Sequence, residues 1–217
     1  MAKQTINIAL DIETLSKRPT AAILSIAAKC FTFEGNQPAD NHGNFLSIVN
    51  ASTCAMYGLH TDMETVDWWS RNSPDAKRWH LECNGVSESI KSALLSLKNY
   101  YEDVKKAFPD ATILIWCQGT DFDISILRNA FQVVLGTDAP WPFSCVRDSR
   151  TFINGIVGLI CPEEENPYKV IPDNPNWKAH DALSDCEQLI WNVRHVAKMF
   201  SSSISDNGIT TSQQQNL

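Results

Sequence analysis

The chain has 217 residues, of which 43% are hydrophobic and 20% are charged, and its formal net charge is −7 at pH 7. This length and composition are typical of one globular domain with a sizeable core. The negative charge excludes a protein that coats long duplex nucleic acid through a basic face, but it is compatible with a site in which bound cations offset a few phosphates.

Membrane and secretion signals are absent from the sequence. No apolar run approaches the roughly 18 residues of a membrane span, and the start Met-Ala-Lys-Gln-Thr lacks the apolar stretch of a signal peptide. The seven cysteines form no C-x-x-C pair. We therefore expect reduced, mostly buried thiols, no structural zinc site, no membrane contact and a cytoplasmic location.

The first half of the chain predicts strands followed by helices. Apolar runs indicate three strands, at residues 5–11, 21–33 and 44–49. Gly35-Asn36 is a turn signal after the second of these strands. Helices are expected over residues 64–82, with an interruption near Ser73-Pro74, and over 87–108, which Pro109 closes.

The second half alternates strand and helix. The wholly apolar run 112–117 suits a strand in the middle of a sheet. Helices are expected over residues 121–135, 148–159 and 181–200. Residues 162–178 hold four prolines and predict a long loop, a kind of segment that often carries function.

The order of the elements predicts one domain over residues 1–200. Strands followed by helix–strand–helix units favour an α/β or α+β three-layer architecture with a mixed central sheet. Residues 201–217, rich in Ser, Gln and Asn, are expected to be a disordered tail.

The first acidic cluster is Asp11-Ile12-Glu13-Thr14, which directly follows the apolar run 6–10. Because side chains alternate along a strand, Asp11 and Glu13 should share one face. The plainer alternative is a strand end that breaks into a polar loop, with Thr14 turning the chain.

The second cluster is Thr120-Asp121-Phe122-Asp123, directly after the strand expected at 112–117. Asp123 lies three residues after Thr120, so a helix capping box is an alternative to a functional site. Asp121 and Asp123 compete for any functional role. Both clusters fall at the C-terminal ends of strands, where open α/β sheets usually place their sites.

The third cluster runs from His180 to Asp185. On a regular helix these two residues would point about 140° apart, so they converge only if His180 precedes the helix or lies in a distorted first turn. Asp181 and Asp185 could instead be ordinary acids of a helix N-terminus. Taken together, clustered carboxylates call for a divalent cation and a nearby histidine supplies a base, which indicates metal-assisted phosphodiester hydrolysis.

These three motifs resemble those of the DEDDh 3′→5′ exonucleases of the proofreading-exonuclease superfamily. The matching residues are Asp11-x-Glu13, then Phe122-Asp123 followed by Leu127, and His180-x-Ala182-x-x-Asp185. The resemblance spans about residues 6–199 and implies a ribonuclease-H-like fold that acts on the 3′ ends of single-stranded DNA or RNA. It implies that Asp11, Glu13, Asp123 and Asp185 hold two divalent cations, Mg²⁺ or Mn²⁺, with His180 as general base, and it favours Asp123 over Asp121.

A closer resemblance comes from residues 64–76, which contain Thr65-Val66-Asp67-Trp68-Trp69. This stretch is similar to phage exonuclease A and to the exoribonuclease family typified by a mycobacterial adenylate-specific RNase. Many DEDDh enzymes carry His-Asn where this chain has Gln118-Gly119, which puts substrate contacts there in question. Related exoribonucleases pair in solution, so a homodimer is expected, with four aromatic residues available for its interface: Trp141, Phe143, Phe152 and Trp177.

The resemblance also suggests substrate contacts. Thr14 and Leu15 would meet the terminal nucleotide, and Phe122 would pack beside it. Of Trp68 and Trp69, one is expected in the core and the other could stack a base. The competing functions are an endonuclease or small-nucleotide phosphodiesterase on the same fold, and a catalytically silent or regulatory nucleic-acid-binding protein.

Overall fold

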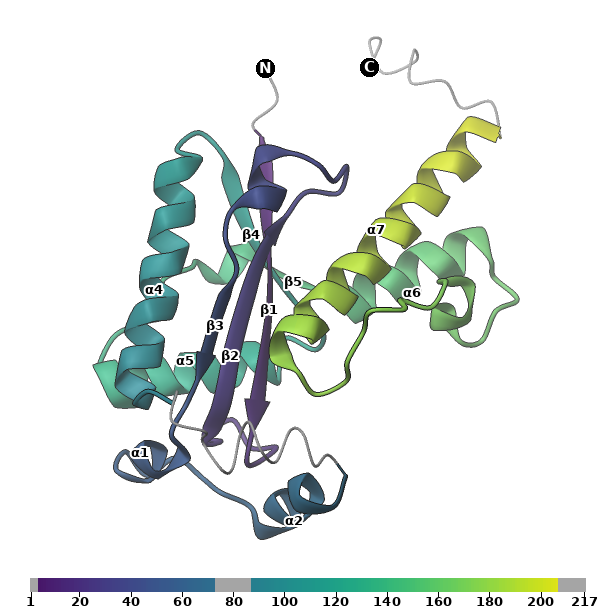
Figure 1. Cartoon of the computed structure of the whole chain (residues 1–217). Helices are drawn as coiled ribbons and strands as arrows, with labels where there is room; N and C mark the ends of the chain where they lie inside the picture. Colours follow the sequence, from purple (N-terminus) through teal and green to yellow (C-terminus); the bar gives the residue numbers. More distant parts are fainter. Residues whose placement is uncertain (1–3, 73–86, 207–217) are drawn as a thin grey trace.

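A five-stranded mixed sheet lies at the centre of the computed structural model, which describes residues 4–72 and 87–206 (Figure 1). Its strands are β1 Thr5–Thr14, β2 Ile23–Phe31, β3 Phe45–Ile48, β4 Thr112–Cys117 and β5 Val146–Asp148. They stand in the order β3-β2-β1-β4-β5. β1 pairs antiparallel with β2 and parallel with β4, so the predicted mixed sheet is confirmed.

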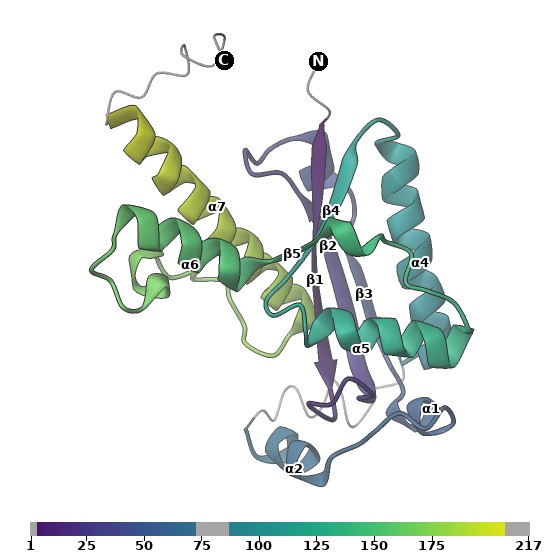
Figure 2. The same cartoon turned by 180° about the vertical axis from the view of Figure 1, so that it is seen from behind.

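Helices cover both faces of the sheet and complete the predicted three layers (Figures 1 and 2). α4 and α5 lie on one face, and α6 and α7 lie on the other. The helices are α1 Ala51–Ala55, α2 Met63–Asn72, α4 Ile90–Ala107, α5 Asp123–Ala130, α6 Ser149–Ile160 and α7 Ala182–Asp206. None of the helices in the described part of the chain is long and apolar enough to cross a membrane.

The period of two along β1 divides its side chains between two cores. The even-numbered Ile6, Ile8, Leu10 and Ile12 belong to the core under α4 and α5. Ala9, on the opposite face, belongs to the core under α6 and α7. Asp11 and Glu13 continue the odd-numbered face, so they point to the α7 side.

Local signals account for the ends of α4. Ser89 caps its first turn, because the Ser89 hydroxyl accepts a hydrogen bond from the Ser92 N–H at 3.1 Å. The helix ends at Phe108, directly before Pro109, as the sequence predicts.

The sequence does not predict two short elements, α1 and β5, and one helix, α7, is longer than predicted. α1 has five residues and β5 has three, which is too short for a periodic pattern. The expectation of a disordered tail is wrong for residues 201–206, because α7 runs to Asp206. There the Ser201, Ser202 and Ser205 hydroxyls each donate to the backbone carbonyl four residues earlier. Residues 207–217, and the interruption expected near Ser73-Pro74, lie outside the described residues.

Two of the four aromatic residues expected at a dimer interface pack within the protein. Trp141 is buried against Phe131, and Phe152 packs edge-on against Trp116. The other two are exposed, Phe143 at 82% and Trp177 at 48%. The six cysteines in the described segments are free thiols, and four of them are buried, as predicted.

Candidate active site

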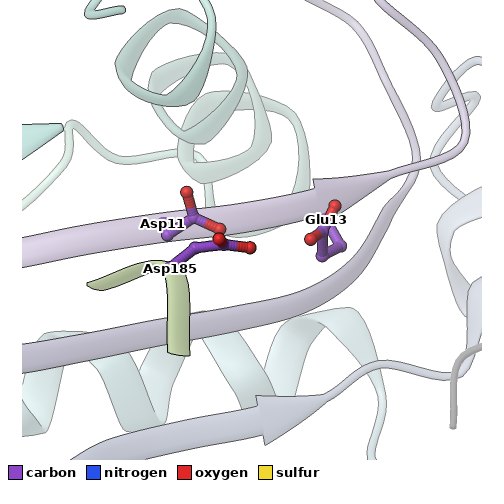
Figure 3. A group of neighbouring side chains, drawn as sticks. All are labelled: Asp11, Glu13 and Asp185. Carbon is purple, nitrogen blue, oxygen red and sulfur yellow. The ribbon is translucent and has the colours of Figure 1, made fainter. Parts of the chain in front are cut away.

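The two predicted carboxylates on β1, those of Asp11 and Glu13, face α7, the helix that carries the predicted carboxylate of Asp185. Asp11 and Glu13 lie two residues apart near the C-terminal end of β1, and Asp185 comes to them from the first turn of α7 (Figure 3). One carboxylate oxygen from each of these three residues lies within 4.8 Å of the other two. The alternative in which Asp11 and Glu13 only mark a strand end is therefore not what the structure shows.

Small side chains let α7 approach the sheet at this point. Ala9 on β1 and Ala27 on β2 are both fully buried beneath the helix. Cys186, next to Asp185, reaches the Ala27 carbonyl with its Sγ at 3.6 Å. A larger residue at either alanine would hold the helix away, and the Asp185 carboxylate would move away with it.

Asp123 begins α5 on the loop that leaves β4, and its side chain is only 4% exposed. The N-cap of α5 is Phe122, without a side-chain hydrogen bond, so no capping box with Thr120 forms. Burial raises the pKa of Asp123 to about 7, although the Ile12 and Asp123 backbone N–H groups and the charge of Arg150 oppose the rise. The competing Asp121 is exposed to solvent.

The carboxylates resist ionisation together. Desolvation raises the pKa of Glu13 to about 8, and the charges of Asp185 and Asp123 add to the effect. The pKa of Asp11 rises well above its ordinary value, first by burial and then by repulsion from Asp123 and Glu13. Burial also raises the pKa of Asp185. Such a set of oxygen donors, crowded and short of positive charge, fits hard divalent cations.

His180 lies just before α7 in a left-handed backbone conformation, with φ of 63°. This geometry answers the question left by the spacing, because His180 precedes the regular helix and so can meet Asp185. Its backbone N–H donates to Asp185 Oδ2 at 3.0 Å, and Trp177 Nε1 donates to Asp185 Oδ1 at 2.7 Å. A non-glycine residue at positive φ is strained, a feature that concentrates at functional sites.

Asp181 and Asp185, both proposed as ordinary helix acids, divide the roles. Asp181 accepts a hydrogen bond from the Ser184 N–H at 3.0 Å and caps the first turn of α7. Asp185 instead turns to the cluster on β1. The imidazole of His180 stands edge-on to the Trp68 ring, with ring centroids 4.8 Å apart.

One cavity of about 600 Å³ unites the catalytic and metal-binding residues predicted from sequence. It is lined by all five of them: Asp11, Glu13, Asp123, Asp185 and His180. These residues come from β1, the start of α5 and the start of α7, so only the folded chain brings them together.

A second cavity of about 550 Å³ adjoins the first and shares Glu13 and Phe122 with it. It also contains Thr14, Trp68 and Trp69. Trp69 is buried and donates its Nε1 to the Thr14 carbonyl at 3.0 Å, whereas Trp68 is 39% exposed. The expected division into one core and one accessible tryptophan matches this arrangement.

Leu15 departs from its predicted place. Its side chain is 5% exposed, belongs to the core and lines neither cavity. The chain turns there because the Leu15 N–H and carbonyl bond Ala22 and Asp62, which buries the side chain. The structure therefore offers no contact between the Leu15 side chain and a ligand in these cavities.

Sequence reasoning did not assign to the site several polar or aromatic residues that line the first cavity, among them Arg150, Tyr168, Trp177 and Gln188. Tyr168 and Trp177 lie on the proline-rich loop that was singled out as functional in character, so composition gave a partial signal for them. Arg150 and Gln188 belong to helices whose sequence pattern does not distinguish them from residues of a solvated face.

Comparisons with known proteins give a family and a fold. The family model described as the 3′-5′ exoribonuclease Rv2179c-like domain matches residues 6–198. No curated protein matches the chain in sequence.

Among solved structures, the chain is similar to exonuclease I. Its apo form aligns with 14% identity and a TM-score of 0.59 over 94% of this chain and 45% of that chain. The zinc-bound E. coli complex with single-stranded DNA aligns with 14% identity and a TM-score of 0.55 over 94% of this chain and 43% of that chain. The present chain thus spans less than half the length of these proteins. At this identity the likeness shows the fold, which is ribonuclease-H-like as expected.

Removing one buried charge should stabilise the protein in the absence of metal. For a carboxyl whose folded pKa is raised, the folded state binds more protons than the unfolded state between about pH 4 and pH 7, so stability falls as pH rises through this window. Asp123→Asn abolishes that loss. In EDTA at pH 8, its melting temperature should exceed that of the wild type by at least about 2 °C.

Mg²⁺ should then reverse the order of the two melting temperatures, so that the wild type melts above Asp123→Asn. It should raise the melting temperature of the wild type and leave Asp123→Asn nearly unchanged, because a ligand stabilises only the state that binds it. The matched control is Asp121→Asn, at an exposed carboxylate two residues away, which should behave like the wild type throughout. Equal pH dependence of Asp123→Asn and wild type would contradict the burial of this charge.

Proposed function

The chain belongs to the family of Rv2179c-like 3′-5′ exoribonuclease domains, and from this we propose that it is a metal-dependent 3′→5′ exonuclease that removes nucleotides from single-stranded RNA ends. The observation that carries the proposal is the single cavity lined by Asp11, Glu13, Asp123, Asp185 and His180. A catalytically silent binding protein would not require all five groups in one place.

The four carboxylates would hold two divalent cations, Mg²⁺ or Mn²⁺. Their oxygen donors suit hard cations, and burial together with neighbouring acidic charge raises the pKa values of Asp11, Glu13, Asp123 and Asp185, an environment that a bound cation would relieve. When bound, such a pair of ions stabilises charge on the attacking and leaving oxygens of an in-line displacement.

His180 would act as the general base. His180 lines the same cavity as the carboxylates, so its ring would be in reach of the attacking water and would accept its proton. Asp185 holds the backbone of His180 through the 3.0 Å hydrogen bond, and Trp68 limits the position of the ring. The strained backbone of His180, with φ of 63°, would therefore serve to position the His180 side chain.

The terminal nucleoside would enter the second cavity. Thr14, Trp68 and Phe122 line this cavity, and Glu13 connects it with the carboxylate cluster. The partly exposed Trp68 offers an aromatic surface to the terminal base. The scissile phosphate would then lie at the carboxylates, between the two cavities. The remaining strand would leave across the first cavity.

Cleavage should proceed stepwise from the 3′ end and should require a divalent ion. A 5′-labelled single-stranded RNA should give a descending ladder with Mg²⁺ or Mn²⁺ and no product in excess EDTA. A matched DNA oligomer should be cut more slowly, in keeping with the family. Immediate release of the labelled 5′ nucleotide, or cutting of a circular strand, would favour the endonuclease alternative.

The His180→Ala change should lower the rate by about 10²–10⁴-fold, the usual worth of a positioned base. Mg²⁺ should still raise its melting temperature, because the four carboxylates remain. The control is His195→Ala, at a histidine within α7 whose Nδ1 lies 2.8 Å from the Trp191 carbonyl oxygen and which does not line this cavity. Loss of the Mg²⁺ effect in His180→Ala would make the histidine a ligand, and near-normal activity would make it a bystander.

We also propose a homodimer that forms over the β5 edge of the sheet. β5 is an edge strand, and Phe143 lies three residues before it with 82% of its surface exposed. Light scattering at micromolar concentration should give a mass near twice 24.3 kDa. Phe143→Glu should halve that mass. The control is Met56→Glu, at an apolar residue that is also exposed but lies at the end of α1, and it should leave the mass of the dimer unchanged.

A further inference from the structure

Arg150 is a positive charge in a cavity dominated by carboxylates. It lies in the first turn of α6 and lines the first cavity. Among the described residues that line this cavity, it is the only lysine or arginine. Arginine binds phosphate well because its planar guanidinium presents several N–H donors in a fixed fork.

The Arg150 guanidinium has no acidic partner among the described residues. Within the described residues, no carboxylate lies at ion-pair distance from Arg150. The carboxylate of Asp148, two residues earlier, instead accepts hydrogen bonds from the Thr120 N–H at 3.0 Å and from the Thr151 N–H at 2.8 Å. The charge of Arg150 is thus available to a ligand of the cavity.

Gly119 provides the surface against which Arg150 packs. It has a φ of +112°, and a Cβ at this position would stand 3.2 Å from Arg150 Nη1. A side chain at residue 119 would therefore be strained and would press on the guanidinium. Gly119, where the chain departs from the DEDDh pattern, is thus the residue against which the Arg150 guanidinium packs.

A second polar group in the same cavity lacks a partner. The Tyr168 hydroxyl is buried and makes no hydrogen bond in the described structure, although Tyr168 lines the cavity. An unpaired buried hydroxyl is unfavourable, and a hydrogen bond to a phosphate oxygen or to water would relieve that cost. The charge of Arg150 also lowers the pKa of Tyr168 against the larger effect of burial, which shows that the two groups lie near each other.

Arg150 lies on the Asp123 side of the cavity. Its guanidinium packs against Gly119, on the loop that leaves β4 and reaches Asp123 four residues later. Glu13 is the residue shared with the second cavity, where the terminal nucleoside is proposed to lie. A strand that crosses from Glu13 past Asp123 would next bring its backbone to Arg150.

We propose that Arg150 and Tyr168 bind the phosphodiester that lies one nucleotide 5′ of the scissile phosphate. The guanidinium and the phenolic O–H would both donate to its oxygens. This inference rests on the proposed exonuclease function. It assigns the pair to positioning the strand, with no part in the bond cleavage itself.

Substrate length tests the assignment. A dinucleoside monophosphate contains only the scissile phosphate, whereas a trinucleoside diphosphate also contains the next one. Arg150→Ala should lower kcat/KM for release of the 3′ nucleotide by about 10–100-fold with the trinucleotide, mainly through KM, and leave the dinucleotide unchanged. Arg150→Lys should recover only part of the loss, because lysine keeps the charge but not the fork.

Tyr168→Phe gives an independent variant. It removes only a hydroxyl that has no partner, so its melting temperature should equal or exceed that of the wild type. Its kcat/KM should nevertheless fall with the trinucleotide and not with the dinucleotide. The matched control is Arg147→Ala: the Arg147 guanidinium donates to the carbonyls of Ser144 and Val146 at 2.8 Å, and the residue does not line the cavity. It should act normally on both substrates.

Three outcomes would overturn the assignment. An equal loss on both substrates would place Arg150 at the scissile phosphate, and no loss on either would make it a surface residue. A weaker Mg²⁺ effect on the melting temperature of Arg150→Ala would show that it acts through Asp123. If the wild-type protein cleaved neither substrate, nor a longer RNA, the proposed function itself would fail. A wild type that is active beside an unaffected Arg150→Ala variant would reject this inference alone.

Discussion

Carboxylates that repel one another must be held together, and the packing of α7 against β1 and β2 is the contact that brings Asp185 to Asp11 and Glu13. Ala9 and Ala27 let the helix approach, and Cys186 seals it onto the β2 backbone. Asp185 is thereby brought within 4.8 Å of Asp11 and Glu13. The raised pKa values of these groups measure the electrostatic cost, which the apolar cores on both faces of the sheet offset.

The same helix start fixes the base. His180 adopts a positive φ because its N–H and the Trp177 indole both bond the Asp185 carboxylate, so one acidic side chain orders the loop that precedes α7. The metal-binding groups and the base are therefore not independent. A shift of α7 would move Asp185, the His180 ring and the loop that carries Trp177 together.

The two adjoining cavities give the site a direction. Glu13 and Phe122 stand where the cavities meet, with the partly exposed Trp68 on one side and Arg150 on the other. An aromatic surface suits a base, and an arginine suits a phosphate. The asymmetry of these side chains is consistent with a strand that enters in one polarity and is cut next to its end.

The sequence by itself determined the architecture and the five central residues, because both depend on local patterns. Apolar runs marked β1, β2 and β4, helical spacing marked α4, and the acidic clusters marked Asp11, Glu13, His180 and Asp185, whereas Asp123 was preferred to Asp121 through the resemblance to the DEDDh exonucleases. Only the tertiary structure decided what depends on contacts between distant segments. It buried Leu15 and Trp141, extended α7 through residues expected to be disordered, and placed Arg150 and Tyr168 in the same cavity as the carboxylates. No local pattern encodes such placements, because each depends on how closely a helix or loop packs against a sheet whose strands lie far away in the chain.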